Sequence, residues 1–587
     1  MTAASDKPTV RLTVDGRLVE ARQGQTLLEA LRQAGYEVPT LCHLEGLAPF
    51  GGCRLCVVEV SGARTLVTAC SQPVSEGMVV RTHTPAVHKA RRQVLELLLA
   101  DHPQECASCL RSDDCGLRSL AARYGARVGL WADGVHRRAL KEEPDVSSPS
   151  IVRDAAKCIL CGRCVRICQE QQGIGAIDFT GRGFDLGVAP AFKAPLSEAA
   201  CVYCGQCVVH CPTGALTERD DTGRAWELLG RPDTTVVVQI APAVRVSVAE
   251  AFGAPVGTPI TGQIVAALRR LGFSRVFDTD FGADLTVMEE AAELVHRLAA
   301  PREQAPLPLM TSCCPGWVKY VEHYFPERLG HLSSCRSPHE MVGALAKTYY
   351  AEKEGLDPSH VVMVSIMPCT AKKFEAQREE LQGSVDLVLT TRELVRMLRL
   401  AGIDPTRLEP EAFDPLMGAS TGAAVIFGRT GGVAEAALRT AYWMATGKDL
   451  PEEKLEWEEL HRAGQIRRLR VELGSRVLRC AVVDGLKAAR ELLESPEYEQ
   501  LDFVEVMACP GGCVGGGGQM RGQDLVARVE RRAQSLAGLD RTSPLRRAHE
   551  NPEIRAVYQE YLGSPGSARS HQLLHTHYVD RGVPLAR

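Results

Sequence analysis

The chain has 587 residues, which is long enough for roughly four domains of about 150 residues each. Its formal net charge is −4, so no overall basic field argues for nucleic acid as a partner. No run of about 18 uncharged apolar residues occurs, and the N-terminus lacks a basic segment followed by an apolar one. We therefore expect a cytoplasmic protein with no membrane insertion.

The 22 cysteines are many for such a protein. They fall in tight groups, often with two residues between neighbouring cysteines, rather than at the spacings of a disulfide scaffold. In a reducing compartment this pattern indicates metal binding. Iron–sulfur clusters are the leading explanation.

The first segment begins with two short alternating runs, residues 11–14 and 17–21, joined by Asp-Gly. This pattern predicts a β-hairpin with a type I′ turn, and a helix is expected over residues 26–34. A C-x10-C-x2-C-x13-C array follows. Its thiolates suit a 2Fe-2S cluster, although the spacing alone would also serve zinc. The four cysteines are Cys42, Cys53, Cys56 and Cys70.

The next array has one histidine and three cysteines and follows a basic helix expected over residues 88–100. As a bare motif it fits zinc and iron about equally. Together the two arrays resemble the N-terminal iron–sulfur module of respiratory complex I and of related hydrogenases. That resemblance implies a 2Fe-2S cluster in the first array and a 4Fe-4S cluster in the second. The second set of ligands would be His102, Cys106, Cys109 and Cys115.

Two copies of the run C-x2-C-x2-C-x3-C follow, which is the cysteine spacing of bacterial ferredoxins. Chance would very rarely produce this spacing twice. In two-cluster ferredoxins the fourth cysteine of each run crosses to the other cluster, so each predicted 4Fe-4S cluster combines both runs. The first set is Cys158, Cys161, Cys164 and Cys211. The second set is Cys201, Cys204, Cys207 and Cys168.

From residue 234 the pattern changes to apolar runs that alternate with helical stretches. This alternation predicts an α/β domain with largely parallel sheets. No G-x-G-x-x-G motif follows a strand, so NAD(P)H, if used, would act through a partner protein. Strands are expected near residues 235–240, 275–279, 307–310, 361–367, 385–389, 478–483 and 503–507, and helices over 264–271 and 285–299.

Three of the strand-like runs end at cysteines, in residues 311–317, 367–375 and 505–519. Because α/β folds build sites at the carboxyl ends of parallel strands, we expect the three segments to form one site. Cys313 and Cys314 are adjacent, and one can hold a metal while the other stays a free thiol. The glycines at 511, 512 and 515–518 would let the backbone pass close to something bulky.

These three segments are similar to the signature motifs of the iron-iron (FeFe) hydrogenases, and the resemblance in arrangement covers essentially the whole chain. It implies an H-cluster, in which a 4Fe-4S cube is joined through a cysteine sulfur to a two-iron unit with CO, cyanide and a bridging dithiolate amine. Cys513 would bridge the two parts, and Cys313 would be the free thiol beside the amine. The ligands of the cube would be Cys314, Cys369, Cys509 and Cys513.

The same resemblance assigns roles around the two-iron unit. Lys372 would donate to a cyanide ligand, and an ammonium group offers three donors to a buried anion. The short backbone segment at Ala241 and Pro242 would face cyanide as well. Met367 and Met507 would form an apolar wall, although plain core methionines would give the same pattern.

Hydrogen chemistry at a buried metal needs a proton route. Glu290, Glu293 and Arg297 lie at i, i+3 and i+7, hence on one face of a predicted helix, where a generic charged face would be solvated. In the family the matching positions and a serine form a proton chain. From the inside outward it would be Cys313, Glu290, Ser333, Glu293 and Arg297. A thiol with an ordinary pKa of about 8.5 is a plausible final donor near neutral pH.

Three residues depart from the family pattern. His339 stands where familiar members carry Gln near a bridging CO, Met520 replaces the usual Pro, and Cys335 occupies a position usually filled by Ala. These departures concern oxygen tolerance and catalytic bias rather than the reaction. Cys335 and Cys480 are otherwise expected to be structural thiols.

The resemblance implies reversible H2 oxidation and proton reduction, with the H-cluster, one 2Fe-2S cluster and three accessory 4Fe-4S clusters as cofactors. Electrons would reach ferredoxin or a flavin-containing NAD(P)H-oxidising subunit that docks near residues 1–220. The two-iron unit would need hydrogenase maturation proteins. An H2-sensing relative would tend to lack Cys313, and a cluster-assembly relative would lack the complete motifs at 311–317 and 505–519. The N-terminal module could also serve a molybdenum-dependent dehydrogenase, but the later motifs do not suit a pterin site.

We predict a multidomain chain of α+β and α/β parts. Residues 1–82 would form a β-grasp 2Fe-2S domain, and residues 83–122 a 4Fe-4S segment with one His and three Cys ligands. Residues 140–222 would form a bacterial-ferredoxin-like domain with two 4Fe-4S clusters. Residues 233–587 would form the α/β H-cluster domain with mostly parallel sheets.

Overall fold

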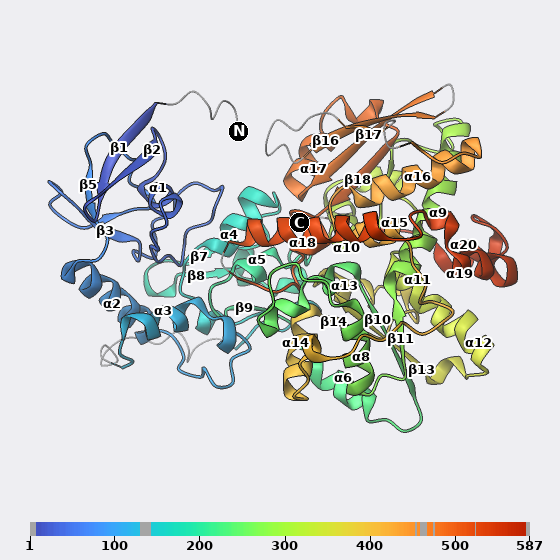
Figure 1. Ribbon diagram of the computed structural model, residues 1–587, viewed down its shortest axis with the longest axis horizontal. Coiled ribbons are helices and arrows are strands. Elements are labelled where there is room, and N and C mark those ends of the chain that lie inside the picture. Colours follow the sequence, from blue (N-terminus) through green and yellow to red (C-terminus); the bar gives the residue numbers. More distant parts are fainter. Residues whose placement is uncertain are drawn as a thin grey trace.

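A computed structural model describes residues 8–129, 143–451, 455–457, 466–473, 476–522 and 524–582. In Figure 1 the N-terminal segments, in blue and cyan, lie on one side, and the larger α/β region lies on the other. The domain limits predicted at residues 1, 140 and 587 fall outside the described residues. No helix in the described part of the chain is both long and apolar enough to cross a membrane.

The N-terminal segment forms a mixed five-stranded sheet. The predicted hairpin is confirmed, with Asp15 at φ 46° and Gly16 at φ 82°, as a type I′ turn requires. Helix α1 (Leu27–Gln33) begins at a capping box between Thr26 and Glu29, and this matches the predicted helix. In spatial order the strands are β2 (Arg17–Arg22), β1 (Thr9–Val14), β5 (Val79–Arg81), β3 (Val57–Val60) and β4 (Val67–Thr68).

Two helices follow this sheet and pack against each other, α2 (Pro85–Ala100) and α3 (Gly116–Tyr124). The predicted basic helix is confirmed, but it begins three residues earlier, because Thr84 caps it and Pro85 suits its first turn.

The repeated cysteine runs form a small unit between the first segment and the α/β region (Figure 1). Each run leads into a short helix that begins after a left-handed glycine, at Gly162 and Gly205. The helices are α4 (Arg163–Arg166) and α5 (Gln206–His210), and the antiparallel pairs are β6 (Ile151–Arg153) with β9 (Leu216–Glu218) and β7 (Asp178–Thr180) with β8 (Gly187–Ala189).

The first sheet of the α/β region is entirely parallel, as predicted. Buried branched side chains fill it on both faces, which is why its strands read as continuous apolar runs. In spatial order its strands are β11 (Arg275–Asp278), β10 (Thr235–Ile240), β13 (Val361–Met367) and β14 (Leu387–Thr390). The helices used below are α8 (Thr261–Leu271), α9 (Thr279–Ala299), α11 (Pro338–Leu345) and α14 (Thr391–Leu400).

The second sheet is mixed, but five of the seven strand pairings in the two sheets are parallel, so the prediction of mostly parallel sheets is confirmed for the described residues. β12, β18 and β17 are parallel, whereas β17, β16 and β15 form an antiparallel meander. Strand β16 alternates buried and exposed residues near its end, because an antiparallel sheet can leave one face in water. In spatial order the strands are β12 (Leu309–Met310), β18 (Phe503–Met507), β17 (Arg476–Asp484), β16 (Ile466–Leu473) and β15 (Glu456–Trp457).

The C-terminal helices run along the outside of the α/β region, and α18 crosses the ribbon in Figure 1. Buried Arg532 of α18 bonds Glu250 at 2.7 Å and the carbonyl of Val514, so the helix is fixed to the loop after β18. These helices are α18 (Leu525–Thr542), α19 (Pro552–Val557) and α20 (Ala568–Leu574), whereas the preceding helix α16 (Gly432–Thr446) is largely buried.

Candidate active site and metal centres

The three cysteine-bearing strand ends meet between the two sheets. β12 and β18 belong to one sheet and β13 to the other. Thr311 Oγ1 accepts from the amide of Val506, and the Gly518 amide donates to the Pro368 carbonyl at 2.8 Å. The ends are thus joined by hydrogen bonds across both sheets. One site formed by strand ends was predicted, but its position between two sheets was not.

The four thiols predicted for the cube share this junction. Burial raises the pKa of Cys369 to about 12, with the charge of Cys314 acting in the same direction. Burial likewise raises the pKa of Cys513, with Cys369 and Cys314 adding to the effect. Four such thiolates can coexist here only around a strong positive charge, because each ionised sulfur disfavours the next. The donor set therefore fits a cationic metal group. The four are Cys314, Cys369, Cys509 and Cys513.

Among the described residues, which include all 22 cysteines, three ligand atoms come within 4.8 Å of one another only at His339, Glu340 and Glu375.

The glycine-rich segment after β18 is packed tightly, but against the polypeptide. A Cβ on Gly516 would lie 2.2 Å from the Pro368 carbonyl oxygen, and one on Gly517 would lie 2.4 Å from that of Cys204. Gly512, at φ 89°, approaches Thr430 in the same way. The predicted close approach is confirmed, but the neighbour is polypeptide backbone. The lack of side chains lets this loop fit between two strand ends.

Lys372 points its ammonium group into the junction. It donates to the Cys313 carbonyl at 3.1 Å and to Glu375 Oε2 at 2.6 Å. Burial acts to lower the pKa of Lys372, but the Glu375 carboxylate outweighs it, so the pKa lies above its usual value. A buried cation is thereby kept beside the place predicted for the two-iron unit.

His339 hydrogen-bonds the same Glu375 carboxylate to which Lys372 donates. Its Nε2 lies 2.7 Å from Glu375 Oε2, and its Nδ1 lies 3.3 Å from Ser365 Oγ. Burial lowers the pKa of His339 to about 4, so the ring is neutral at physiological pH. Both carboxyl oxygens of the adjacent Glu340 are buried without a hydrogen bond from the described residues, and burial raises its pKa well above the usual range. The positive charge of this cluster is supplied by Lys372.

The apolar residues predicted for the wall lie in the same region. Met367 is 3% exposed and Met507 is 2% exposed, and both belong to the core cluster against which Cys313 packs. Ala241 is the residue before α7 (Pro242–Arg245), and its amide donates to the Ile366 carbonyl at 3.1 Å. Ala241 and Met367 therefore lie at the end of β13, and Met507 ends β18.

Hydrogen bonds join four of the five predicted relay residues, Glu290, Ser333, Glu293 and Arg297. Ser333 Oγ donates to Glu293 Oε2 at 2.9 Å, and Ser333 also hydrogen-bonds Glu290. The charge of Glu290 acts on Cys313, whose pKa burial raises well above its usual range. Glu290 Oε2 is buried and receives no hydrogen bond from the described residues.

Burial raises the pKa of Glu290 to about 8, with the charge of Glu293 acting in the same direction and the Ser333 hydrogen bond opposing it. Glu290 is therefore protonated at neutral pH. A carboxyl group whose pKa lies near the working pH can both give and take a proton.

Arg297 is 9% exposed, and each of its five N–H groups donates to protein. Glu293 Oε1 receives two of them, the closer at 2.6 Å, and three backbone carbonyls receive the rest. The guanidinium therefore holds the Glu293 carboxylate in place at the predicted outer end of the relay.

The cysteines of the first array lie in two close pairs. Hydrogen bonds link the side chain of Cys42 with Cys53 and that of Cys56 with Cys70. The hydrogen bond from its partner lowers the pKa of Cys53 to about 6 and that of Cys70 to about 7, so each pair holds one readily ionised thiol. Two pairs of thiols fit a cluster of two irons, with one pair for each iron.

In the second array, His102 Nδ1 is buried with no hydrogen-bond partner among the described residues. Burial lowers the pKa of His102, so its ring is neutral and able to act as a ligand. Cys109 lies beside the ferredoxin-like unit, where a Cβ on Gly214 would meet its sulfur at 2.8 Å. His102 Nδ1, which has no hydrogen-bond partner among the described residues, and the three thiols are suitable metal ligands.

The ferredoxin-like unit contains a cavity lined by all four cysteines of the first predicted set, Cys158, Cys161, Cys164 and Cys211. The crossing of the fourth cysteine to the other run is thus reproduced in space. For the second set, Cys168 lies close enough to Cys201 and Cys207 to raise their pKa values.

The second set also adjoins the strand-end junction. Cys509 Sγ lies 3.9 Å from the Cys204 carbonyl, Thr370 Oγ1 donates to the Tyr203 carbonyl, and Gln206 Nε2 donates to the Gly515 carbonyl. At the other end, Cys161 shares a hydrophobic cluster with Cys42, Cys53 and Cys115. The four accessory cysteine groups therefore lead continuously to the junction.

Sequence reasoning missed two acidic groups near the relay. Glu505 of β18 accepts from the amides of Gly431 and Ala434, and burial raises its pKa to about 7. The sequence signal that could have identified Glu505 is a single carboxylate in an otherwise apolar strand. Glu289, next to Glu290 on α9, binds C-terminal residues that no local pattern connects with it.

Five family descriptions match the chain in the order of its segments. They are the 2Fe-2S iron-sulfur cluster binding domain (7–85), the NADH-ubiquinone oxidoreductase-G iron-sulfur binding region (91–128), the 4Fe-4S dicluster domain (157–215), the iron only hydrogenase large subunit, C-terminal domain (234–517), and the iron hydrogenase small subunit (526–581).

Two curated proteins are similar over nearly the full length. The NADP-reducing hydrogenase subunit HndD of Solidesulfovibrio fructosivorans is 47% identical, over 97% of this chain and 99% of that protein. Iron hydrogenase 1 of Clostridium pasteurianum is 38% identical over 97% and 99%. Among solved structures, an apo form of [FeFe]-hydrogenase HydA1 from Chlamydomonas reinhardtii covers 62% of this chain and 100% of its own, with 42% identity and a TM-score of 0.55.

Proposed function

This chain belongs to the FeFe hydrogenases, and we propose that it couples H2 oxidation and proton reduction at an H-cluster to electron transfer along four accessory clusters. Its full-length relatives are named as hydrogenases, which are enzymes. The observation that carries the proposal is the meeting of four buried thiols at the three strand ends, with a fifth, Cys313, beside a buried glutamic acid.

When bound, the H-cluster supplies the metal chemistry that makes and splits H2. Cys314, Cys369, Cys509 and Cys513 would hold it, with Cys513 as the bridging ligand. Lys372, kept charged by Glu375, would stabilise an anionic ligand of the two-iron unit. Ala241, Pro242, Met367 and Met507 would close the site and exclude water.

The chain's own side chains would move the proton. Cys313 passes it to Glu290, which is protonated at neutral pH and can therefore release one proton as it accepts another. Ser333 then links Glu290 to Glu293. Arg297 holds the Glu293 carboxylate in place through their ion pair at 2.6 Å.

The four accessory iron–sulfur clusters would carry electrons in series between the partner protein and the H-cluster. We assign one 2Fe-2S cluster to a β-grasp fold in the first sheet, one 4Fe-4S cluster to His102 and its three cysteines, and two 4Fe-4S clusters to the ferredoxin-like unit. The contact of Cys509 with Cys204 supports entry of electrons into the H-cluster from the second of these two.

The partner would be ferredoxin or a flavin-containing NAD(P)H-oxidising subunit in the cytoplasm. HndD is named as a subunit of an NADP-reducing hydrogenase, which supports the second choice. Maturation proteins would be needed to supply the two-iron unit.

Infrared spectroscopy of the matured protein tests the proposal. We expect bands of metal-bound CO and cyanide that shift under H2 and under added CO, because only a loaded two-iron unit carries these ligands. Absence of the bands from a preparation with its full iron content after successful maturation would refute the assignment. Bands with no H2 turnover would favour the H2-sensing alternative.

A further inference from the structure

A buried lysine lies between the ferredoxin-like unit and the strand-end junction. Lys319 belongs to α10 (Pro315–Tyr324), the helix that begins directly after Cys314. It is 4% exposed, and lysine is rarely buried to this degree without a charged partner. A cation taken out of water needs a compensating negative group, because burial alone destabilises the charge.

The side chains around the ammonium group are mostly aromatic. Lys319 Nζ lies 4.7 Å from the centroid of the Tyr203 ring and 5.3 Å from that of the Phe374 ring. The two rings are themselves in contact, with centroids 5.3 Å apart. Such rings attract a cation through their faces, but they carry no net charge.

The hydrogen-bond partner of Lys319 is a neutral histidine. Its Nζ lies 2.7 Å from His323 Nε2, and His323 Nδ1 donates to the Gly582 carbonyl, so Nε2 is left as the acceptor. Burial lowers the pKa of His323 to about 4, so the ring carries no charge at physiological pH. The fixed tautomer therefore holds the lysine in place without compensating its charge.

The acid on the same helix is committed elsewhere. Glu322 is ion-paired with Arg378 and with Arg581, the latter at 2.8 Å. Burial lowers the pKa of Lys319 to about 8, with the charge of Cys201 opposing the change, so the ammonium group stays charged at neutral pH. Within the described part of the chain, Lys319 is thus a buried cation without an ion-pair partner.

The C-terminal tail, residues 575–582, is held against the segment that follows β12. The Arg336 amide donates to the Leu574 carbonyl at 2.8 Å, and the Thr576 amide donates to the Ser334 carbonyl at 2.7 Å. Ser334 Oγ lies 2.8 Å from His575 Nδ1. These bonds fix the path of the tail toward α10.

The end of this tail closes over the surroundings of Lys319. The Arg581 amide donates to the Glu322 carbonyl at 3.0 Å, next to the bond between His323 and Gly582. The Arg581 guanidinium lies 5.3 Å from the centroid of the Phe374 ring, which also contacts Lys319. The tail and the two rings therefore shield the lysine from water, where its charge acts more strongly on its neighbours.

The loop that Lys319 faces carries two predicted cluster ligands. Tyr203 stands between Cys201 and Cys204 in the second ferredoxin-like run. Burial raises the pKa of Cys201 to about 11, and the charge of Lys319 opposes this rise. The lysine therefore stabilises negative charge on this sulfur.

The two cysteine runs have similar backbones but different charges beside them. Leu160 of the first run matches Tyr203 of the second, and both have left-handed backbones, at φ 55° and 58°. The lysine that adjoins the first run, Lys157, is ion-paired with Asp154 at 2.7 Å. A carboxylate thus compensates Lys157, whereas Lys319 has no such partner among the described residues.

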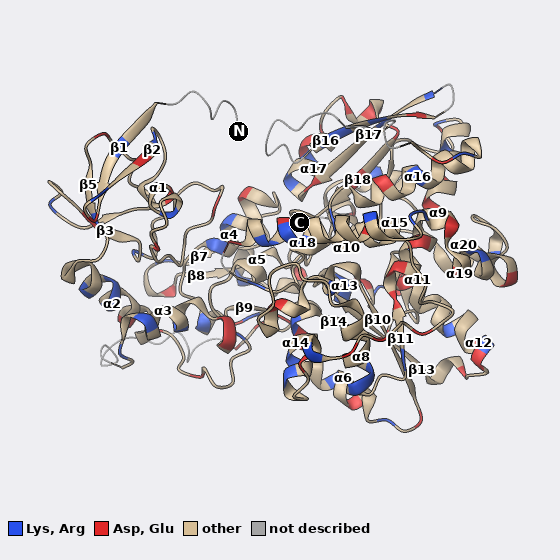
Figure 2. Ribbon diagram, viewed as in Figure 1, with Lys and Arg blue, Asp and Glu red and all other residues tan. Residues whose placement is uncertain are grey.

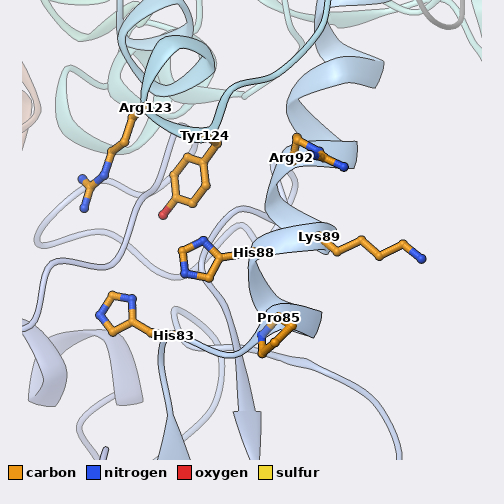
Figure 3. Close-up of a pocket in the computed structure, with 7 residues that line it drawn as sticks. All are labelled: His83, Pro85, His88, Lys89, Arg92, Arg123 and Tyr124. Carbon is orange, nitrogen blue, oxygen red and sulfur yellow. The ribbon is translucent and has the colours of Figure 1, made fainter.

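The basic residues near the first array are exposed instead. Figure 3 shows Lys89 and Arg92 extending from α2 beside His88, around a pocket of about 410 Å³. Figure 2 shows the blue bands of α2 and α3 in this region. Arg92 is paired with Glu96 at 3.7 Å. Because water and salt screen exposed charges, Lys89 provides a control for buried Lys319.

We propose that Lys319 raises the reduction potential of the 4Fe-4S cluster assigned to Cys168, Cys201, Cys204 and Cys207. The inference rests on the proposed function, in which this cluster exchanges electrons with the H-cluster. A cluster with four thiolate ligands gains one more negative charge when it takes up an electron. A fixed cation therefore stabilises its reduced form more than its oxidised form.

The electron would come from the H-cluster during H2 oxidation and from the preceding accessory cluster during H2 evolution. A higher potential at this position favours the removal of electrons from the H-cluster. Lys319 touches neither H2 nor a predicted ligand sulfur, so its contribution is electrostatic.

The test is a redox titration followed by EPR spectroscopy, using the full-length protein with its iron–sulfur clusters reconstituted but without the two-iron unit. We expect one 4Fe-4S signal to titrate at a lower potential in Lys319→Met and in Lys319→Gln, which keeps a donor for His323. The reduced-to-oxidised ratio of that cluster at fixed potential should fall about tenfold, equivalent to about 59 mV for a one-electron couple. The other signals should not move.

Two control variants separate charge from packing. Lys319→Arg keeps the charge and should keep the potential, and Lys89→Met removes an exposed lysine and should leave every potential unchanged. Unshifted potentials in both neutral variants at position 319 would overturn the proposal. So would an equal fall in Lys319→Arg, since packing rather than charge would then set the potential.

The EPR result and the hydrogenase function can fail separately. Absence of the infrared bands from the matured, unmodified protein would refute the function without changing the potentials of the accessory clusters. An unshifted potential in a protein that shows those bands would refute the role of Lys319 alone.

Discussion

Cys313→Ala is expected to reduce H2 turnover by at least about a hundredfold while leaving the CO and cyanide infrared bands in place. The thiol is the innermost proton-carrying group of the relay, and a positioned acid or base contributes about 100- to 10,000-fold. Alanine keeps the backbone carbonyl to which Lys372 donates, so the cluster site should remain intact. Dye-coupled assays in both directions, together with infrared spectra, measure the effect.

Cys480→Ala is the control, because Cys480 is a buried thiol on β17 that belongs to none of the predicted ligand sets or relay residues. Its turnover per loaded site should equal that of the unmodified enzyme. Full activity of Cys313→Ala would remove this thiol from the route. Loss of its infrared bands would instead assign it a role in holding the cluster.

Glu290→Gln should cause a similarly large loss, about a hundredfold, because an amide cannot exchange the proton that the carboxyl passes between Cys313 and Ser333. The direction in which H2 evolution changes with pH follows from the pKa of Glu290. Since burial raises the pKa of Glu290 to about 8, the carboxyl is a proton donor below that pH and ionises above it. H2 evolution by the unmodified enzyme should therefore fall as the pH rises through about 8.

This alkaline step should be absent from the residual activity of Glu290→Gln. Glu303→Gln is the control, since Glu303 is exposed just beyond the same helix. If Glu290→Gln kept both the rate and the alkaline step, protons would not pass through this residue.

Much of the architecture could be predicted because its determinants are local. The strands at residues 235–240, 361–367 and 503–507 agree with β10, β13 and β18 to the residue, since each is a short apolar run that must be buried on both faces. The crossing of Cys211 to the first run was also accessible, because the ferredoxin spacing prescribes it.

What could not be predicted depends on contacts between distant residues. The apolar run in β17 showed a strand, but not that β16 pairs with it in the antiparallel sense. The glycines after Cys513 showed close packing, but not that the neighbours are the Pro368 and Cys204 carbonyls. Ser334 and His575 are 241 positions apart, and no local pattern pairs them.

For Arg297, the sequence predicted the position of the side chain but not its contacts. Its spacing from Glu293 placed it correctly on the relay face of α9. Only the structure shows that every N–H is occupied, two by Glu293 and three by backbone carbonyls, so that the guanidinium holds the Glu293 carboxylate in place.

The tail that carries His575 is covalently continuous with the catalytic region, although residues 526–581 match a description of a small subunit. A tethered segment meets its binding groove at an effective concentration on the order of millimolar, whatever the dilution of the protein. Transient detachment of the tail from Ser334 and Arg336 would then be a first-order event that reverses without a search for a partner. The fraction of molecules with the tail in its groove should accordingly be independent of enzyme concentration.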